Sequence, residues 1–182
     1  MKNLIASIVA LAGILVASSA AAQTPPDTFC KATQTFAASY WGEWLSLDGA
    51  GQIVQYPKKT VNVGNAFDTT NFTAPCSGVF SFTISFVRDA DVHTKCTQQG
   101  TTDDVFIQVW LHPAAGGSDQ LIGSHFGAWA GQTPTNVGRA TGTVTVVAQL
   151  NQNDIVYTKA LSDNAGPICL GEATFDASKI GR

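Results

Sequence analysis

The stretch from Phe80 to Val87 constrains the fold more than any other part of the sequence. Large apolar residues alternate with hydroxyl residues along it, with Phe80, Phe82, Ile84 and Phe86 in one set and Ser81, Thr83 and Ser85 in the other. Side chains along a β-strand point to opposite faces with a period of two residues. The pattern therefore predicts a strand with an aromatic core face and a hydroxyl-rich outer face. Pro75 and Gly78 mark the start of this stretch.

Further alternating segments, separated by turn residues, follow one another along the chain. The segments expected to be strands are 52–56, 60–63, 105–111, 119–126, 141–150, 155–160 and 170–180. No stretch of helical period follows Asp48, so the succession predicts an all-β sandwich or jelly roll. Residues 34–47 remain open. Their aromatic residues, which include Tyr40, Trp41 and Trp44, fit either an early strand followed by a bend or a short amphipathic helix.

The N-terminus has the features of an export signal. Lys2 precedes an apolar run from Leu4 to Val16, and small residues end the segment at Ala22. The run is shorter than the roughly 20 apolar residues that cross a bilayer, so we expect no membrane span. We expect residues 1–22 to be a signal peptide cleaved near Ala22, which makes the protein secreted, either extracellular or periplasmic. Residues 23–50 would join the sandwich, and residues 51–182 would form its main domain.

Charge and cysteine content narrow the class of protein. The net charge is −3 and no cluster of Lys and Arg is present, which argues against a nucleic-acid partner. Charged residues make up 13% of the chain, against roughly 25% in an average protein, and neutral polar residues take their place. An even number of cysteines in an exported chain indicates two disulfides, formed by Cys30, Cys76, Cys96 and Cys169.

A wider set of residues resembles the signature of the complement C1q globular-head family. The matching positions are Tyr56 (usually Phe in the family), Asn62, Phe67, Phe72, Gly78, Phe80, Phe82 and Phe175. The segment Leu150 to Val156, with Asn153-Asp154 at its centre, is similar to the family's Leu-x-x-Gly-Asp-x-Val turn. The resemblance covers Gln52 to Ile180. Asn153 stands where the family has Gly, and Phe80 where it has Tyr.

The resemblance implies a fold, an assembly and a disulfide pattern. The fold is a jelly-roll β-sandwich of about ten short antiparallel strands, and the C1q and tumour necrosis factor families assemble as trimers, so the chain would form a homotrimer. In the family's layout the last strand runs between the first strand and the central one. That arrangement would pair Cys30 with Cys76 at one end of the sandwich and Cys96 with Cys169 at the other.

Two sets of residues are candidates for ligand binding. Trp41, Trp44 and Trp129, together with Trp110, would form a sugar-stacking surface if exposed, although tryptophan is more often buried in a core or a subunit interface. Asp89, Asp91, Asp103 and Asp104 offer the oxygen ligands that calcium prefers, as in some relatives of the family, although their spacing matches no defined calcium loop and also fits a solvated loop. No cofactor is required by either reading.

A catalytic reading receives little support. Ser124 and His125 are adjacent, so on a strand they would face opposite sides and could not form a nucleophile–base pair. Glu43 and Glu172 could in principle form a carboxylate pair of the kind glycosidases use, but the sequence does not place them together. We therefore expect a secreted, non-enzymatic, C1q-like binding module whose ligand is a protein or a glycan. A carbohydrate-active enzyme or sugar-binding module is the first alternative, and a structural surface or coat subunit is the second.

Overall fold

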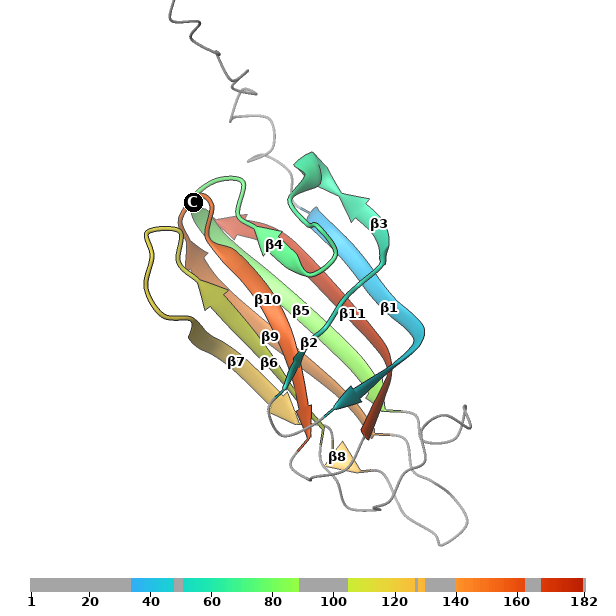
Figure 1. Ribbon diagram of the computed structural model, residues 1–182. Coiled ribbons are helices and arrows are strands. Elements are labelled where there is room, and N and C mark those ends of the chain that lie inside the picture. Colours follow the sequence, from blue (N-terminus) through green and yellow to red (C-terminus); the bar gives the residue numbers. More distant parts are fainter. Residues whose placement is uncertain are drawn as a thin grey trace, which may run out of the picture.

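Two antiparallel sheets lie face to face in the computed structural model (Figure 1). The structure describes residues 34–47, 51–88, 105–126, 128–129, 140–162 and 168–181, with side chains described at 51–86, 106–125, 141–161 and 172–181. Within those residues the regular structure is β, apart from the short 3-10 turn η2 (Val63–Asn65). The chain is a jelly-roll sandwich, as the sequence predicted.

The first sheet has six strands. Their spatial order is β3 (Lys58–Asn62), β1 (Gln34–Leu47), β11 (Ile168–Gly181), β5 (Gly78–Arg88), β9 (Ala140–Leu150) and β8 (Ala128–Trp129). The last strand, β11, pairs antiparallel with β1 on one side and β5 on the other, as the family layout implies (Figure 1). Residues 34–47 are one strand rather than a helix, because β11 and β3 supply ladder partners on both edges.

The second sheet has five strands. Its order is β2 (Gln52–Ile53), β10 (Ile155–Ser162), β6 (Val105–His112) and β7 (Gln120–Phe126), with β4 (Asn71–Thr73) also paired to β10. β10 and β6 are the two strands with full-length pairing here, from Ile155 opposite His112 to Ser162 opposite Val105. The short strands β4 and β8 were not predicted, because each has only two or three residues and owes its extended backbone to a neighbour.

The core lies between the sheets and is strongly aromatic. The apolar set of β5 is buried as predicted, with Phe80, Phe82 and Ile84 fully inaccessible. Phe72 lies 5.5 Å from Phe80 and 5.4 Å from Phe82 between ring centroids, and Phe82 lies 6.0 Å from Phe175. Such tilted and edge-on pairs each add about 0.5–1.5 kcal/mol to ordinary burial. The central stretch therefore does what its pattern indicated, which is to pack.

The residues that resemble the family signature make packing contacts and hydrogen bonds that hold the fold together. Tyr56, Phe67 and Phe175 form a second aromatic group with centroid distances of 5.5–6.2 Å. Asn62 fixes Phe67 from both sides, since its Nδ2 donates to the Phe67 carbonyl at 2.7 Å and its Oδ1 accepts from the Phe67 N–H at 2.9 Å. A Cβ at Gly78 would lie 2.8 Å from the Gly181 carbonyl oxygen, so the β5–β11 approach requires glycine there.

Candidate ligand-binding surface

The outer faces of the two sheets differ in chemistry. On the six-stranded sheet, the outward residues of β5 and β9 are mostly hydroxyl-bearing, and Ser85 Oγ and Thr143 Oγ1 share a hydrogen bond of 3.0 Å across the strands. No described side chain of β5 or β9 is charged. The outer face of the five-stranded sheet carries aromatic and charged side chains instead. The second face is therefore the better candidate for ligand chemistry.

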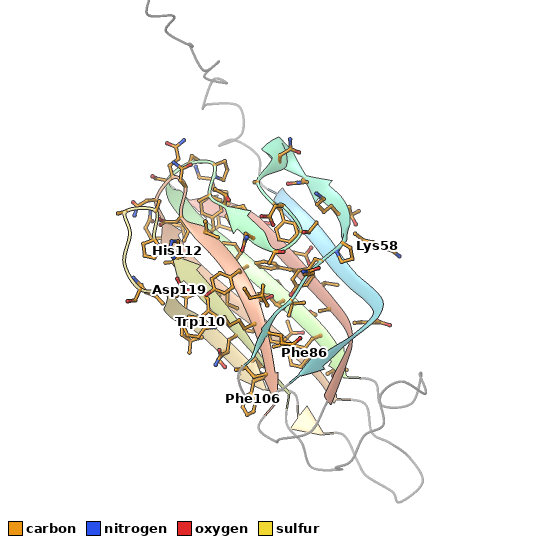
Figure 2. All side chains as sticks on the ribbon, in the orientation of Figure 1. Lys58, Phe86, Phe106, Trp110, His112 and Asp119 are labelled. Carbon is orange, nitrogen blue, oxygen red and sulfur yellow. The ribbon has the colours of Figure 1, made fainter. Side chains whose placement is uncertain are left out.

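Strand β6 supplies the aromatic part of this surface. Ile107, Val109 and Leu111 point into the core, so the alternate residues of β6 point outward. Trp110 is half-buried on that outer side, and its Nε1 donates to Gln108 Oε1 at 3.0 Å. Figure 2 shows Phe106, Trp110 and His112 along the same side of the sandwich, with Asp119 beside them. The structure therefore describes the side chain of Trp110, whereas the side chains of the other three tryptophans lie outside the described residues.

Strand β10 adds a cation and a phenol. Lys159 pairs with Gln108 across the strands, and Tyr157 pairs with Trp110. The Lys159 ammonium lies 4.9 Å from the Trp110 ring centroid and 5.7 Å from that of Tyr157. A cation within about 6 Å of an aromatic ring centroid is attracted by the negative face of the ring. The ammonium of Lys159 therefore lies over the indole and close to the phenol ring.

Asp119 links three elements at the end of this surface. Its Oδ1 lies 2.7 Å from His112 Nδ1, and its Oδ2 accepts a hydrogen bond from the Tyr157 hydroxyl at 2.5 Å. The bonds from Tyr157 and His112 hold the pKa of the Asp119 carboxyl below its usual value. Burial, together with the bond to Asp119, raises the pKa of Tyr157 to about 12, so the phenol remains a donor. This network joins the end of β6 and the residue preceding β7 to β10.

We call Gln108, Trp110, Tyr157, Lys159, Asp119 and His112 the β6–β10 cluster. The sequence suggested only one of these residues, Trp110, as a site residue. Tyr157 and Asp119 are 38 positions apart, and strand register alone brings them together. An outward Tyr-x-Lys on a strand is a weak signal that could have been noted, but neither residue type is unusual there.

The other predicted site residues are placed only in part. Trp41 and Trp44 lie on β1 and Trp129 lies on β8, but their side chains are outside the described residues. Asp89, Asp91, Asp103 and Asp104 lie outside the described residues altogether, so the calcium site stays a prediction. Within the part of the chain that the structure describes, no group of three or more His, Cys, Asp or Glu side chains could hold a metal ion.

The Ser124–His125 pair behaves as expected of neighbours on a strand. Ser124 lies opposite Gln108 in the register and His125 opposite the buried Ile107, so the two point to different faces. The His125 ring packs edge-on against the core residue Phe86, with centroids 6.5 Å apart. Their placement brings no nucleophile and base together.

One cysteine can be placed with its side chain. Cys76 is disulfide-bonded, and Lys179 Nζ donates to its sulfur at 3.3 Å. Cys169 lies on β11 next to Leu170, which pairs with Arg88 at the far end of β5. The eleven residues of β5 separate these ends by about 3.3 Å per residue, well beyond the roughly 7 Å that a disulfide can bridge between Cα atoms. A Cys76–Cys169 bond within one chain is excluded. The side chains of Cys30, Cys96 and Cys169 lie outside the described residues, so the predicted pairing remains a prediction.

Comparison with known proteins gives a fold but no close relative. No protein-family model and no curated protein matches the sequence. Among solved structures, the globular domain of zebrafish complement 1qA protein superimposes with a TM-score of 0.58 at 16% identity, covering 82% of this chain and 98% of that one. Murine APRIL at pH 5.0 superimposes with a TM-score of 0.51 at 10% identity, covering 81% of this chain and 99% of that one. The described structure also contains no helix long and apolar enough to cross a membrane. The chain has the jelly-roll fold shared by the C1q globular domain and APRIL.

Proposed function

We propose that the protein is a secreted, non-enzymatic C1q-like recognition module that binds its ligand multivalently as a homotrimer. The fold likeness supports the C1q-like part of the proposal. Secretion rests on the N-terminal export features that end near Ala22. The number three comes from the family that the sequence resembles. Linked copies raise avidity by roughly 10² to 10⁴ without any new contact, which suits a module that binds rather than converts its ligand.

The outer face of β5 and β9 supports self-association and carries the proposal. Its described side chains are uncharged, and Val147, which lies opposite Ser81, is 60% exposed in the monomer. Charged residues are depleted at the cores of protein interfaces, and this face meets that condition. In addition, among the described residues β8 pairs with β9 at only two positions, Thr141 and Ala140. Within the described ranges the rest of that edge of β9 has no ladder partner, which is compatible with pairing to a second copy.

Light scattering on the processed, oxidised protein tests the assembly. At micromolar concentration, with and without calcium, we expect three times the mass of one chain. Val147→Arg puts a charge on the proposed contact face and should shift the mass toward the monomer. The matched control is Leu121→Arg, since Leu121 is 49% exposed on the opposite sheet and its substitution should leave the mass unchanged. A monomer of the unsubstituted protein in both conditions would refute the trimer.

A further inference from the structure

Lys159 is unusual because it carries a charge at an outward position of β10. Among the described side chains of β6, β7 and β10 it is the one with a permanent charge. It forms no salt bridge with any carboxylate in the described part of the chain, and its contacts are the rings of Trp110 and Tyr157. An ammonium group has three N–H donors, and a ring face satisfies none of them as a carboxylate would. Within the described residues its charge acts on the Asp119 carboxylate, whose pKa it lowers, but no carboxylate lies within salt-bridge distance of it.

Three kinds of group follow one another along the cluster. Lys159 and Gln108 form one cross-strand pair, and the next outward pair is Tyr157 and Trp110, about 7 Å further along. Beyond the rings lies the Asp119 carboxylate. Gln108 Oε1 is bound by the Trp110 indole, so its amide group turns two N–H donors away from that bond. By strand register Lys159 and Gln108 therefore lie on one side of the Tyr157–Trp110 pair and Asp119, bound to His112, on the other, and the Lys159 ammonium reaches over the Trp110 ring.

Asp119 can still accept hydrogen bonds. Among the described residues each of its two oxygens has one hydrogen-bond partner, His112 or Tyr157, whereas a carboxylate has about four acceptor positions. Its side chain is 39% exposed, so the remaining positions face solvent. A ligand hydroxyl could donate to it without displacing either partner. Its orientation is set in advance by His112 on β6 and Tyr157 on β10, which lowers the entropy lost on binding.

We propose that the β6–β10 cluster binds a carboxylated saccharide. The ligand carboxylate meets Lys159 and the Gln108 amide, the apolar C–H face of the sugar ring packs on the part of the Trp110 indole that the Lys159 ammonium does not cover, and hydroxyls on the opposite side of the ring donate to Asp119. A uronic acid has this arrangement, because its carboxylate is attached on one side of the sugar ring and two of its ring hydroxyls are attached on the other side. The site deepens the proposed recognition function by naming its ligand class.

Charge and polarity distinguish this ligand from other occupants. A neutral sugar would leave Lys159 without a carboxylate at salt-bridge distance, and a purely apolar partner would bury Lys159 and Asp119 without a direct ion pair, which is strongly unfavourable. Nucleic acid is disfavoured because the chain has a net charge of −3 and one lysine at this site cannot neutralise a backbone. A carboxylate on a sugar ring satisfies both the cation and the indole.

The test is calorimetric titration of the mature protein with saccharides carrying a single uronic or sialic acid, each compared with its methyl ester. We expect binding of at least one acid and a loss of about tenfold or more in affinity for its ester, since a charge-assisted hydrogen bond is lost. Lys159→Gln should weaken binding of the acid by a similar factor, and Lys159→Arg should retain most of it. Trp110→Ala should weaken acid and ester alike.

The control is Lys58→Gln, which removes the same charge from β3. Figure 2 shows Lys58 on the opposite side of the molecule from Trp110. Equal weakening by Lys58→Gln, equal affinity for acid and ester, or binding of none of the acids would overturn the proposal. Because the ligands are monovalent, a failed trimer leaves this result intact. Conversely, a trimer that binds no carboxylated saccharide would remove the ligand assignment and keep the assembly.

Discussion

The buried pair of Tyr56 and Thr158 offers a sharp test of the packing argument. Both side chains are fully inaccessible, and the Tyr56 hydroxyl and Thr158 Oγ1 lie 2.8 Å apart across 102 positions of sequence. Burial raises the pKa of the Tyr56 phenol above its usual value, so it remains protonated and able to donate. The family that the sequence resembles usually has Phe at this position. The extra hydroxyl is therefore stable here because Thr158 gives it a partner.

The magnitude follows from an asymmetry in hydrogen-bond energetics. Removing one partner leaves the other buried without a hydrogen bond, at a cost of about 1–3 kcal/mol. Replacing both by apolar groups of the same shape is nearly neutral. Tyr56→Phe and Thr158→Val should each cost about 2 kcal/mol. The double substitution should cost less than about 1 kcal/mol. For a chain of this size, 2 kcal/mol corresponds to a fall of about 4–8 °C in the melting temperature.

The measurement is a double-mutant cycle. The free energy of unfolding in urea is determined for the parent, the two single variants and the double variant at one fixed protein concentration. The control is Thr60→Val, which removes a hydroxyl from an exposed position of the edge strand β3, away from the proposed contact face, and should change the free energy of unfolding by less than about 0.5 kcal/mol. If the double variant is as unstable as the sum of the singles, the two hydroxyls do not satisfy each other. The structural explanation for tyrosine at position 56 would then be wrong.

Three further predictions concern the core, the disulfides and the response to acid. Phe82→Ala should cost about 3–5 kcal/mol, because the ring is fully buried between Phe72 and Phe175; an unchanged melting temperature would contradict this. Non-reducing peptide mapping should link Cys30 to Cys76, and a Cys76–Cys96 peptide would refute the layout. The lowered pKa of Asp119 means that its contribution to stability is present above its unfolded pKa and lost as pH falls through its folded pKa. Unfolding at pH 7 and pH 3 should therefore show Asp119→Asn less stable than the parent at pH 7, with a smaller difference between the two at pH 3.

The alternation of apolar and polar residues predicted those parts of the fold that depend on neighbouring residues in the sequence. The faces of β5 follow from the two-residue period of a strand, and the structure buries the expected set. Residues 34–47 could not be assigned in the same way, because their aromatic spacing fits two periods. There the decision comes from β11, which is more than 100 positions away and pairs with β1 from Gln34 to Leu47. Tertiary pairing overrode an ambiguous local preference.

The candidate site was harder to predict than the fold. Trp110 could be singled out by residue type, but Lys159 and Asp119 carry no signal of their own. They meet Trp110 because β10 pairs with β6 in one register and the β6–β7 connection returns Asp119 to the end of β6. A shift of one residue in that register would turn Tyr157 and Lys159 into the core. The site is thus a consequence of a long-range register that sequence alone does not reveal.

The residues that carry the resemblance and the residues that form the candidate site occupy different positions in the same fold. The signature residues, such as Phe72, Phe82 and Phe175, are buried, so they report how the sheets pack. The β6–β10 cluster lies on the outward positions of two strands, where packing places little restriction on residue type. A chain can therefore keep the whole jelly-roll signature while its ligand chemistry changes freely. For this protein, the proposed ligand class therefore rests on Trp110, Lys159 and their neighbours rather than on the fold it shares with the C1q globular domain.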